Sequence, residues 1–207
     1  MLSTVTKAKR PVQKRSIEKV NTMLAEAEKL LINDGLKGVT IHKVAALSGV
    51  SAASVYQFFP TVSALLGTMA ESSMKKGLTL ADAEKARRDL RSWRDVVDLF
   101  VDVAFDFYLN DQVGNALFLN HSFEEGVRDD TCTRATRLGA YFVDILKVIY
   151  RADALINVEE KFAIFHEAQK SIYRRCITIN HCLTIEYREE VRAVAYGYIG
   201  PLFDDLD

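Results

Sequence analysis

Hydrophobic side chains recur along most of this chain at steps of three and four residues, the spacing that places them on one face of an α-helix. The first such run begins at Ser16 and ends at Asn33-Asp34-Gly35, where glycine readily adopts the left-handed backbone angles that end a helix. The same pattern predicts further helices over residues 62–76, 92–108, 112–124, 131–151, 157–179 and 186–199. No segment shows the two-residue alternation of a strand, so the sequence predicts an all-α protein of about nine helices.

Two short helices are expected between residues 40 and 59, and together they form a helix-turn-helix. Thr40 and Ser51 are suitable N-cap residues for them, and Gly49 can supply the turn between. A close crossing of the two helices is expected from four small residues, Ala45, Ala46, Ala52 and Ala53. Valines are expected to fill the space beneath, at Val44, Val50 and Val55. A second helix held in this way presents its N-terminal residues to the major groove of DNA.

Residues 40–60, TIHKVAALSGVSAASVYQFFP, resemble the DNA-binding signature of the TetR/AcrR family of bacterial transcriptional regulators. The run Gly-Val-Ser-x-x-Ser-Val-Tyr-x-x-Phe within it is more specific than a generic helix-turn-helix. The resemblance implies an N-terminal three-helix DNA-binding domain followed by a helical domain for ligand binding and dimerisation. We therefore expect three parts, namely a basic arm at 1–14, a DNA-binding domain at 15–62 with its motif at about 40–59, and an effector-binding and dimerisation domain at 63–207.

The resemblance also implies which side chains meet the DNA. Thr40 and Tyr56 would touch phosphates, Lys43 would contact a phosphate or a base edge, and His42 would face the groove. The bases would be met by Ala52, Ala53, Ser54 and Gln57 of the second helix. Its cap Ser51 is a further expected DNA contact. Bidentate pairing of the Gln57 amide with adenine is worth about 1–3 kcal/mol of discrimination between bases.

The chain departs from the family in its basic residues. The family commonly has Ser-Lys after the Phe-Pro step, whereas this chain has Thr61 and Val62, and its second short helix holds no Lys or Arg. Residues 1–66 carry 9 Lys or Arg against 4 Asp or Glu, whereas residues 67–207 carry 18 against 24. A solvated charged tail would explain this asymmetry equally well on charge alone. With the resemblance, we expect DNA affinity to come from Lys37, Lys43 and the N-terminal arm, which would enter an adjacent minor groove.

The predicted helix at 157–179 carries a stripe that alternates steps of three and four over three heptads. This spacing favours a four-helix bundle between two copies of the chain, with packing inside one chain as the alternative. The residues expected at this dimer interface are Phe162, Phe165, Gln169, Ile172, Cys176, Val191, Val194 and Tyr198.

The middle of the chain is rich in aromatic residues, which either form a core or line an effector cavity. The family usually places such a cavity among its fourth to seventh helices. Polar residues on largely apolar segments are the candidate ligand contacts, namely Tyr108, His121, Tyr141 and Asp144. The aromatic surroundings favour an apolar or aromatic effector.

Composition and missing motifs narrow the function further. The 207 residues are 49% hydrophobic and 27% charged, which excludes a disordered chain, and the 3 cysteines have no CxxC spacing. We find no nucleophile elbow, phosphate loop or HExxH, so we expect no enzyme and no cofactor. His121 and Glu124 alone are too few ligands for a metal.

Residues 44–70 contain no charge, but polar residues interrupt them, and no apolar segment follows the basic N-terminus. We therefore expect a cytoplasmic protein that does not contact membranes. The expected function is that of a homodimeric regulator, most simply a repressor that a small effector releases from a palindromic operator on double-stranded DNA. The alternative is an effector-independent or architectural DNA-binding protein that acts through a protein partner.

Overall fold

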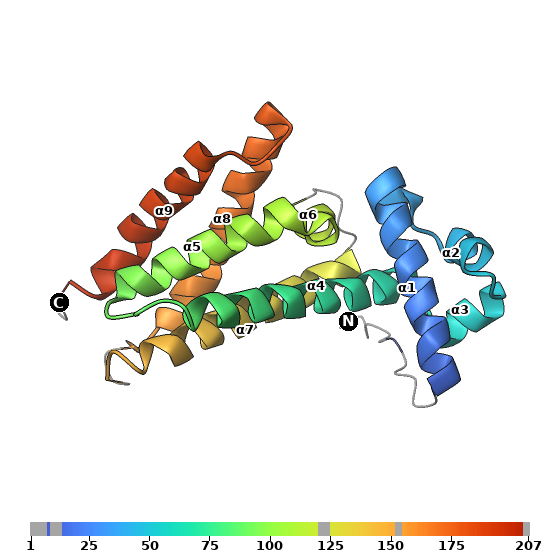
Figure 1. The fold of residues 1–207 in the computed structure, drawn as a ribbon, viewed down its shortest axis with the longest axis horizontal. Coiled ribbons are helices and arrows are strands. Elements are labelled where there is room, and N and C mark those ends of the chain that lie inside the picture. The colour runs from blue at the N-terminus through green and yellow to red at the C-terminus, as the bar shows by residue number, and fades with distance from the viewer. Residues whose placement is uncertain (1–7, 9–13, 120–124, 152–154, 205–207) are drawn as a thin grey trace. The chain divides into compact units, whose positions relative to one another are not determined.

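The computed structural model describes residue 8 and residues 14–119, 125–151 and 155–204, with side chains described in residues 134–151 but not in 125–133. These residues form nine α-helices and contain no strand, which confirms the prediction of an all-α fold (Figure 1). The helices are α1 (Lys14–Asp34), α2 (Ile41–Ser48), α3 (Ala52–Phe58), α4 (Val62–Lys85), α5 (Trp93–Asn110), α6 (Gln112–Phe118), α7 (Glu125–Leu146), α8 (Val158–Asn180) and α9 (Ile185–Ile199). Two single 3₁₀ turns accompany them, η1 (Leu36–Gly38) and η3 (Gly200–Leu202).

Several helix ends follow from local capping chemistry. Thr40 and Ser51 both accept a hydrogen bond from the backbone three residues on, as predicted, and Gly49 takes a φ of 67° at the end of α2. At the start of α5, the side chains of Ser92 and Asp95 each accept a hydrogen bond from the other's backbone amide, which forms a capping box with aspartate in place of glutamate.

Other predicted boundaries were wrong. We expected the fourth helix to stop near Gly77, yet α4 continues to Lys85. A glycine inside a helix costs only about 1 kcal/mol, and here it lies against the ring of Phe107. Helix α7 begins at Glu125 and ends at Leu146, each several residues earlier than predicted. The expected helix at 112–124 ends at Phe118, and residues 120–124 lie outside the described part of the chain.

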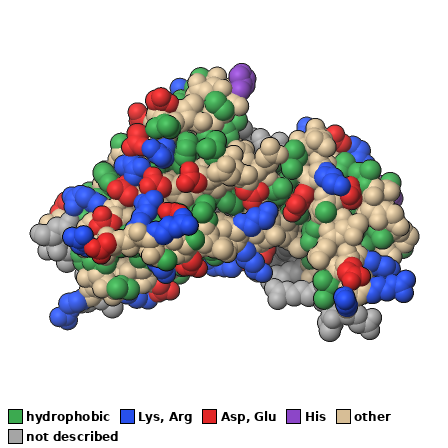
Figure 2. Space-filling model, viewed as in Figure 1, with side chains coloured by type: hydrophobic (Ala, Val, Ile, Leu, Met, Phe, Trp, Pro, Cys, Tyr) green, Lys and Arg blue, Asp and Glu red, His purple; other side chains and the backbone are tan. Residues whose placement is uncertain are grey.

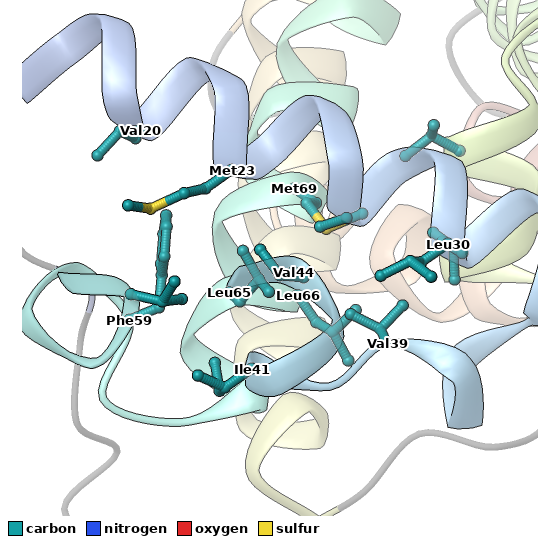
Figure 3. Packing of buried hydrophobic residues seen from close by; sticks show 14 of the residues in the cluster. Val20, Met23, Leu30, Val39, Ile41, Val44, Phe59, Leu65, Leu66 and Met69 are labelled. Atoms are coloured by element: carbon teal, nitrogen blue, oxygen red, sulfur yellow. The ribbon is translucent and has the colours of Figure 1, made fainter. Parts of the chain in front are cut away.

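The described residues fall into two compact units, of which the first comprises those of 1–74 and 111–128. It contains α1 to α3, the first half of α4, and α6, packed around one core (Figure 3). Met23 and Met69 are at most 1% exposed, and so are Val44 and Phe59. This core holds the helix-turn-helix on a fixed support.

The second unit comprises the described residues of 75–110 and 129–207. Helix α5 packs here with α7, α8 and α9, and its Phe100 meets Phe142 and Phe162, whose rings stack with centroids 4.0 Å apart. Gly139 of α7 crosses α8 so closely that a Cβ would lie 2.4 Å from the carbonyl oxygen of Glu159. Acidic and basic side chains are interspersed over the visible surface of this unit (Figure 2).

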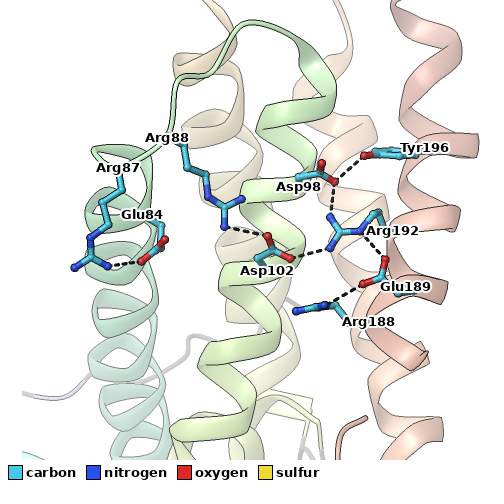
Figure 4. Close-up of polar contacts among 9 residues, drawn as sticks. All are labelled: Glu84, Arg87, Arg88, Asp98, Asp102, Arg188, Glu189, Arg192 and Tyr196. Atoms are coloured by element: carbon cyan, nitrogen blue, oxygen red, sulfur yellow. Dashed lines mark hydrogen bonds and ion pairs between the residues drawn. The ribbon is translucent and has the colours of Figure 1, made fainter. Parts of the chain in front are cut away.

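A charged network ties α9 to α5 in the second unit (Figure 4). The Arg192 guanidinium pairs with Asp98, with Asp102 at 2.8 Å and with Glu189 at 2.9 Å. Arg88, which follows α4, pairs with the other oxygen of Asp102 at 2.9 Å. Because Arg192 is only 19% exposed, these bonds are partly shielded from solvent and orient α9 on α5.

Candidate DNA-binding surface

The helix-turn-helix packs through fewer residues than the sequence suggested. Val44 and Val55 are fully buried, and Ala45 is 6% exposed at the crossing of α2 and α3. Ala46 and Ala53, however, are exposed, so the expectation that four alanines permit the crossing was wrong. The reason is that a helix of two turns can bury only one face, which leaves Ala53 free to meet another molecule.

Most of the predicted DNA contacts lie on the outer side of these helices. Ala52 and Ser54 are half-buried near the N-terminus of α3, and Thr40 is half-buried before α2. The aromatic rings of His42 and Tyr56 meet edge to face with centroids 6.3 Å apart, which joins α2 and α3 into one surface. The exposed members of this surface are His42, Lys43, Ser51, Ala53, Tyr56 and Gln57.

Two of the hydroxyl groups predicted to meet DNA also cap the helices. Thr40 Oγ1 accepts from the Lys43 amide at 3.2 Å, and Ser51 Oγ accepts from the Ser54 amide at 3.2 Å. Ser51 Oγ also donates to Ser54 Oγ, so its proton is already engaged. A hydroxyl that caps through a lone pair keeps its proton for another acceptor. Thr40 thus retains a donor suited to a phosphate oxygen.

The structure adds an acidic partner to this surface that the sequence analysis missed. Lys43 Nζ donates to Asp34 Oδ2 at 2.9 Å, and both side chains are about half exposed. Asp34 is the last residue of α1, nine positions before Lys43. The basic group expected to contact DNA is therefore already paired within the chain, and the carboxylate would compete with a phosphate for it.

The residues predicted to contact an effector do not share one environment. Tyr108 is 4% exposed in the core of the second unit, beside Tyr173, and burial raises the pKa of its hydroxyl. Tyr141 is half-buried and its hydroxyl donates a hydrogen bond to Asp82. Its pKa is raised chiefly by burial and further by this hydrogen bond. Asp144 is exposed and pairs with Lys147 at 2.8 Å. His121 lies outside the described residues.

The predicted dimer stripe needs a correction, because most of it packs inside one chain. Phe162, Phe165, Gln169, Cys176 and Val191 are all at most 1% exposed within the second unit. Ile172 and Tyr198 are half-buried, and Val194 is 40% exposed. A regular stripe shows that a face is buried but not which chain covers it. The apolar residues that do reach the surface of α8 and α9 are Ile164, Ile179, Ile185 and Val194.

The part of the chain that the structure describes contains no cluster of three His, Cys, Asp or Glu side chains placed to hold a metal. None of the described helices has both the length and the hydrophobicity needed to cross a bilayer. The outer face of α2 and α3 carries most of the predicted DNA contacts. A supported helix-turn-helix with an exposed second helix is the arrangement with which many DNA-binding proteins enter the major groove.

Comparison with known proteins agrees with this class. The model of the family described as "Bacterial regulatory proteins, tetR family" matches residues 23–69. A crystal structure of a TetR-family transcriptional regulator from Streptomyces coelicolor has a TM-score of 0.68 and 17% identity, covering 92% of this chain and 100% of that chain. A putative TetR-family transcriptional regulator from Rhodococcus sp. has a TM-score of 0.64 and 16% identity, covering 88% of this chain and 99% of that chain. No curated protein sequence matches.

The family match covers the helix-turn-helix, and the likeness to solved structures extends the shared fold over most of the chain. Residues 23–69 are thus similar in sequence to bacterial regulatory proteins of the tetR family. The fold of the chain is similar to that of solved TetR-family transcriptional regulators.

Proposed function

We propose that this chain is a homodimeric repressor that binds a palindromic operator and leaves it when a small apolar or aromatic effector binds. The observation that carries the proposal is the exposed surface on α2 and α3, formed by side chains suited to DNA. Tyr56 is 45% exposed although its ring is large and apolar, which suits a hydroxyl that reaches a phosphate. The neighbouring amide of Gln57 is exposed on the same helix.

Base recognition in this proposal comes from the side chains of α3. The Gln57 amide offers a donor and an acceptor, the pair that matches N7 and N6 of adenine in the major groove. The methyl group of Ala53 is exposed and suits contact with a thymine methyl. Thr40, Tyr56 and Lys43 would hold phosphates and so set the register of α3 in the groove.

Dimerisation is proposed through the exposed apolar positions of α8 and α9 rather than through the buried stripe. Ile185 is 60% exposed and Val194 is 40% exposed, and a Cβ built on Gly197 of α9 meets nothing within 4 Å. This small, apolar surface suits the close approach of a second α9. Two-fold symmetry would then present two α3 helices to half-sites about 34 Å apart, one turn of DNA.

Release by an effector requires that the effector bind the two states of the dimer unequally. Helix α4 supports this coupling because one continuous helix contributes residues to both compact units. An effector held in the second unit would shift α4 and change the spacing of the two α3 helices.

We place this regulator in the cytoplasm and assign it no catalysis. The second candidate function is an effector-independent DNA-binding protein, which the densely packed aromatic core of the second unit favours.

A selection of binding sites from random duplex DNA tests the DNA-binding proposal. We expect a palindromic site with two half-sites about 10 base pairs apart. Gln57→Ala should relax the preference at one position of each half-site by roughly 5- to 150-fold, the equivalent of about 1–3 kcal/mol. Gln112→Ala, which removes an exposed amide from α6, is the matched control and should leave the preference unchanged. Recovery of unrelated sequences by the wild type would refute the proposal.

Sedimentation of the chain with and without Val194→Glu tests the dimer. A charge at this exposed position should convert a dimer into a monomer while leaving the fold intact, as circular dichroism can check. A wild-type monomer under conditions that allow tight DNA binding would contradict the two-fold arrangement.

A further inference from the structure

Two of the three cysteines meet at the turn that joins α8 to α9 (Figure 1). Cys176 lies near the end of α8, and its thiol donates a hydrogen bond to the backbone carbonyl of Cys182 at 3.2 Å. His181, between them, takes a left-handed φ of 60° directly after the helix. This conformation ends α8 and turns the chain back, so that residues six apart in sequence are in direct contact.

The two thiols differ in their access to solvent. Cys176 is fully buried, whereas Cys182 is exposed. The Cys176 sulfur also accepts a hydrogen bond from Asn180 Nδ2 at 3.6 Å, so polar groups surround it on the side of the turn. A cysteine that serves only as a small hydrophobic side chain needs no such partners. An oxidant in solution therefore meets Cys182 first, and the thiol of Cys176 is already held against the backbone of that residue.

The two cysteines lie within reach of a disulfide. The Cys176 sulfur and the Cys182 carbonyl oxygen are each two covalent bonds from their Cα atoms, so these Cα atoms are at most about 8 Å apart. Disulfides commonly join Cα atoms about 4.4–6.8 Å apart. The Cys182 side chain would rotate toward Cys176 with an adjustment of the turn, and the bond would replace the contact between thiol and carbonyl.

We propose that Cys176 and Cys182 form a reversible disulfide when a hydroperoxide oxidises the chain. The hydroperoxide transfers one oxygen atom to the Cys182 thiol, which becomes a sulfenic acid, and the oxidant leaves as an alcohol, or as water where it is hydrogen peroxide. The Cys176 sulfur then attacks the Cys182 sulfur. The S–O bond breaks, and its oxygen leaves as water with the proton of the Cys176 thiol.

This modification goes beyond the proposed binding of DNA and does not depend on it. Disulfides of proteins in a reducing compartment are usually transient, and they act in catalysis or in the sensing of oxidants. The turn between α8 and α9 would therefore be a site of reversible oxidation, which a dithiol restores to two thiols.

Peptide mass spectrometry of the full chain tests the pairing. The reduced chain is treated with one equivalent of hydrogen peroxide, denatured in N-ethylmaleimide and cleaved with trypsin. Both cysteines then lie in the single peptide 176–188, whereas Cys132 lies in the peptide 129–134. We expect the oxidised peptide 176–188 to have lost two hydrogen atoms and to carry no N-ethylmaleimide. Dithiothreitol added before the N-ethylmaleimide should restore the labelling of both thiols.

Three variants separate the roles of the cysteines. Cys176→Ser should leave Cys182 as a sulfenic acid that dimedone traps, because the second thiol is missing. Cys182→Ser should leave Cys176 unoxidised, because Cys176 is fully buried. Cys132→Ser is the matched control and should form the bond as the wild type does. Circular dichroism checks that each variant is folded, and the wild-type peptide masses decide the pairing without the variants.

The proposal is overturned if Cys176 is still labelled after peroxide has oxidised Cys182. A thiol that only closes the end of α8 through its hydrogen bond would give this result. A peptide that joins 176–188 to 129–134, or a covalent dimer on a non-reducing gel, would also overturn it, because Cys182 would then pair elsewhere. Binding of DNA affects none of these masses, so the proposed function and this proposal can fail independently.

Discussion

The ion pair between Asp34 and Lys43 leads to a prediction about DNA affinity. The Asp34 carboxylate, 2.9 Å from the Lys43 ammonium, would compete with a phosphate for that ammonium. The isosteric substitution Asp34→Asn removes the competing charge and keeps the shape of the side chain. We therefore expect Asp34→Asn to bind DNA more tightly than the wild type, even though Asp34 lies on α1 and not on the helices that are proposed to contact DNA.

The structure sets the size of this effect. The Lys43 side chain is 51% exposed and that of Asp34 is 43% exposed, and ion pairs at such surfaces contribute about 0.2–1 kcal/mol. Release of this competition corresponds to a gain of about 1.4- to 5-fold in affinity. Stability should change little. Asp34 ends α1, where the helix dipole disfavours a negative charge by about 0.3–1 kcal/mol, so the loss of the pair and the loss of the charge offset each other.

Fluorescence anisotropy on a duplex recovered by selection, at several salt concentrations, measures the effect. The background Lys43→Met is the control, because there Asp34→Asn reports only the general repulsion between a carboxylate and DNA. Asp34→Asn should therefore increase DNA affinity less in the Lys43→Met variant than in the wild type, because the release of Lys43 no longer contributes. An equal gain in both backgrounds would show that Lys43 does not exchange Asp34 for a phosphate. A weaker complex with Asp34→Asn would refute the reasoning altogether.

Three further predictions concern other parts of the molecule. Deletion of residues 1–12 should flatten the dependence of log affinity on log salt and keep the sequence preference, and an unchanged slope would exclude the arm from the interface. Gly139→Ala should destabilise the fold by about 1–3 kcal/mol in urea, because its Cβ would lie 2.4 Å from the Glu159 carbonyl oxygen; wild-type stability would contradict the close crossing. Burial, and to a smaller extent the positive charge of Lys170, lowers the pKa of His166 to about 3. At a pH below the ordinary pKa of histidine, the unfolded chain therefore binds a proton that the folded chain does not. Stability should therefore fall between about pH 6.5 and pH 3, by up to about 1.4 kcal/mol per unit, and His166→Gln should reduce this fall; an unaltered pH profile would exclude His166 as its source.

The features that the sequence predicted well depend on neighbours along the chain. Thr40 and Ser51 cap their helices because each hydroxyl reaches an amide three residues away. Gly49 ends α2 because it accepts a positive φ at little cost. The exposed positions of α3 also follow, since Val55 and Phe59 must face the core and the remaining side chains must point outward.

The features that the sequence missed depend on contacts between distant segments. The stripe on α8 was assigned to a second copy of the chain, but Phe162 packs on Phe100 of α5 and Phe142 of α7. Both Phe162 and Cys176 are buried within one chain. Two of the partners of Arg192, Asp98 and Asp102, lie 94 and 90 positions away along the chain, a distance over which periodicity carries no information. Gln169 was predicted as a dimer contact for the same reason. Only the fold shows that this side chain is buried within the second unit of one chain.

The most direct test of DNA recognition by α3 is an anisotropy titration of the double variant Tyr56→Phe, Gln57→Ala against the wild type. The duplexes are DNA from upstream of the chain's own gene, the site recovered by selection, and a random sequence. We predict saturable wild-type binding that prefers one of the first two duplexes over the random one, and a double variant that has lost this preference. Equal and weak wild-type binding to all three duplexes, or a double variant indistinguishable from the wild type, would contradict the recognition of DNA by α3.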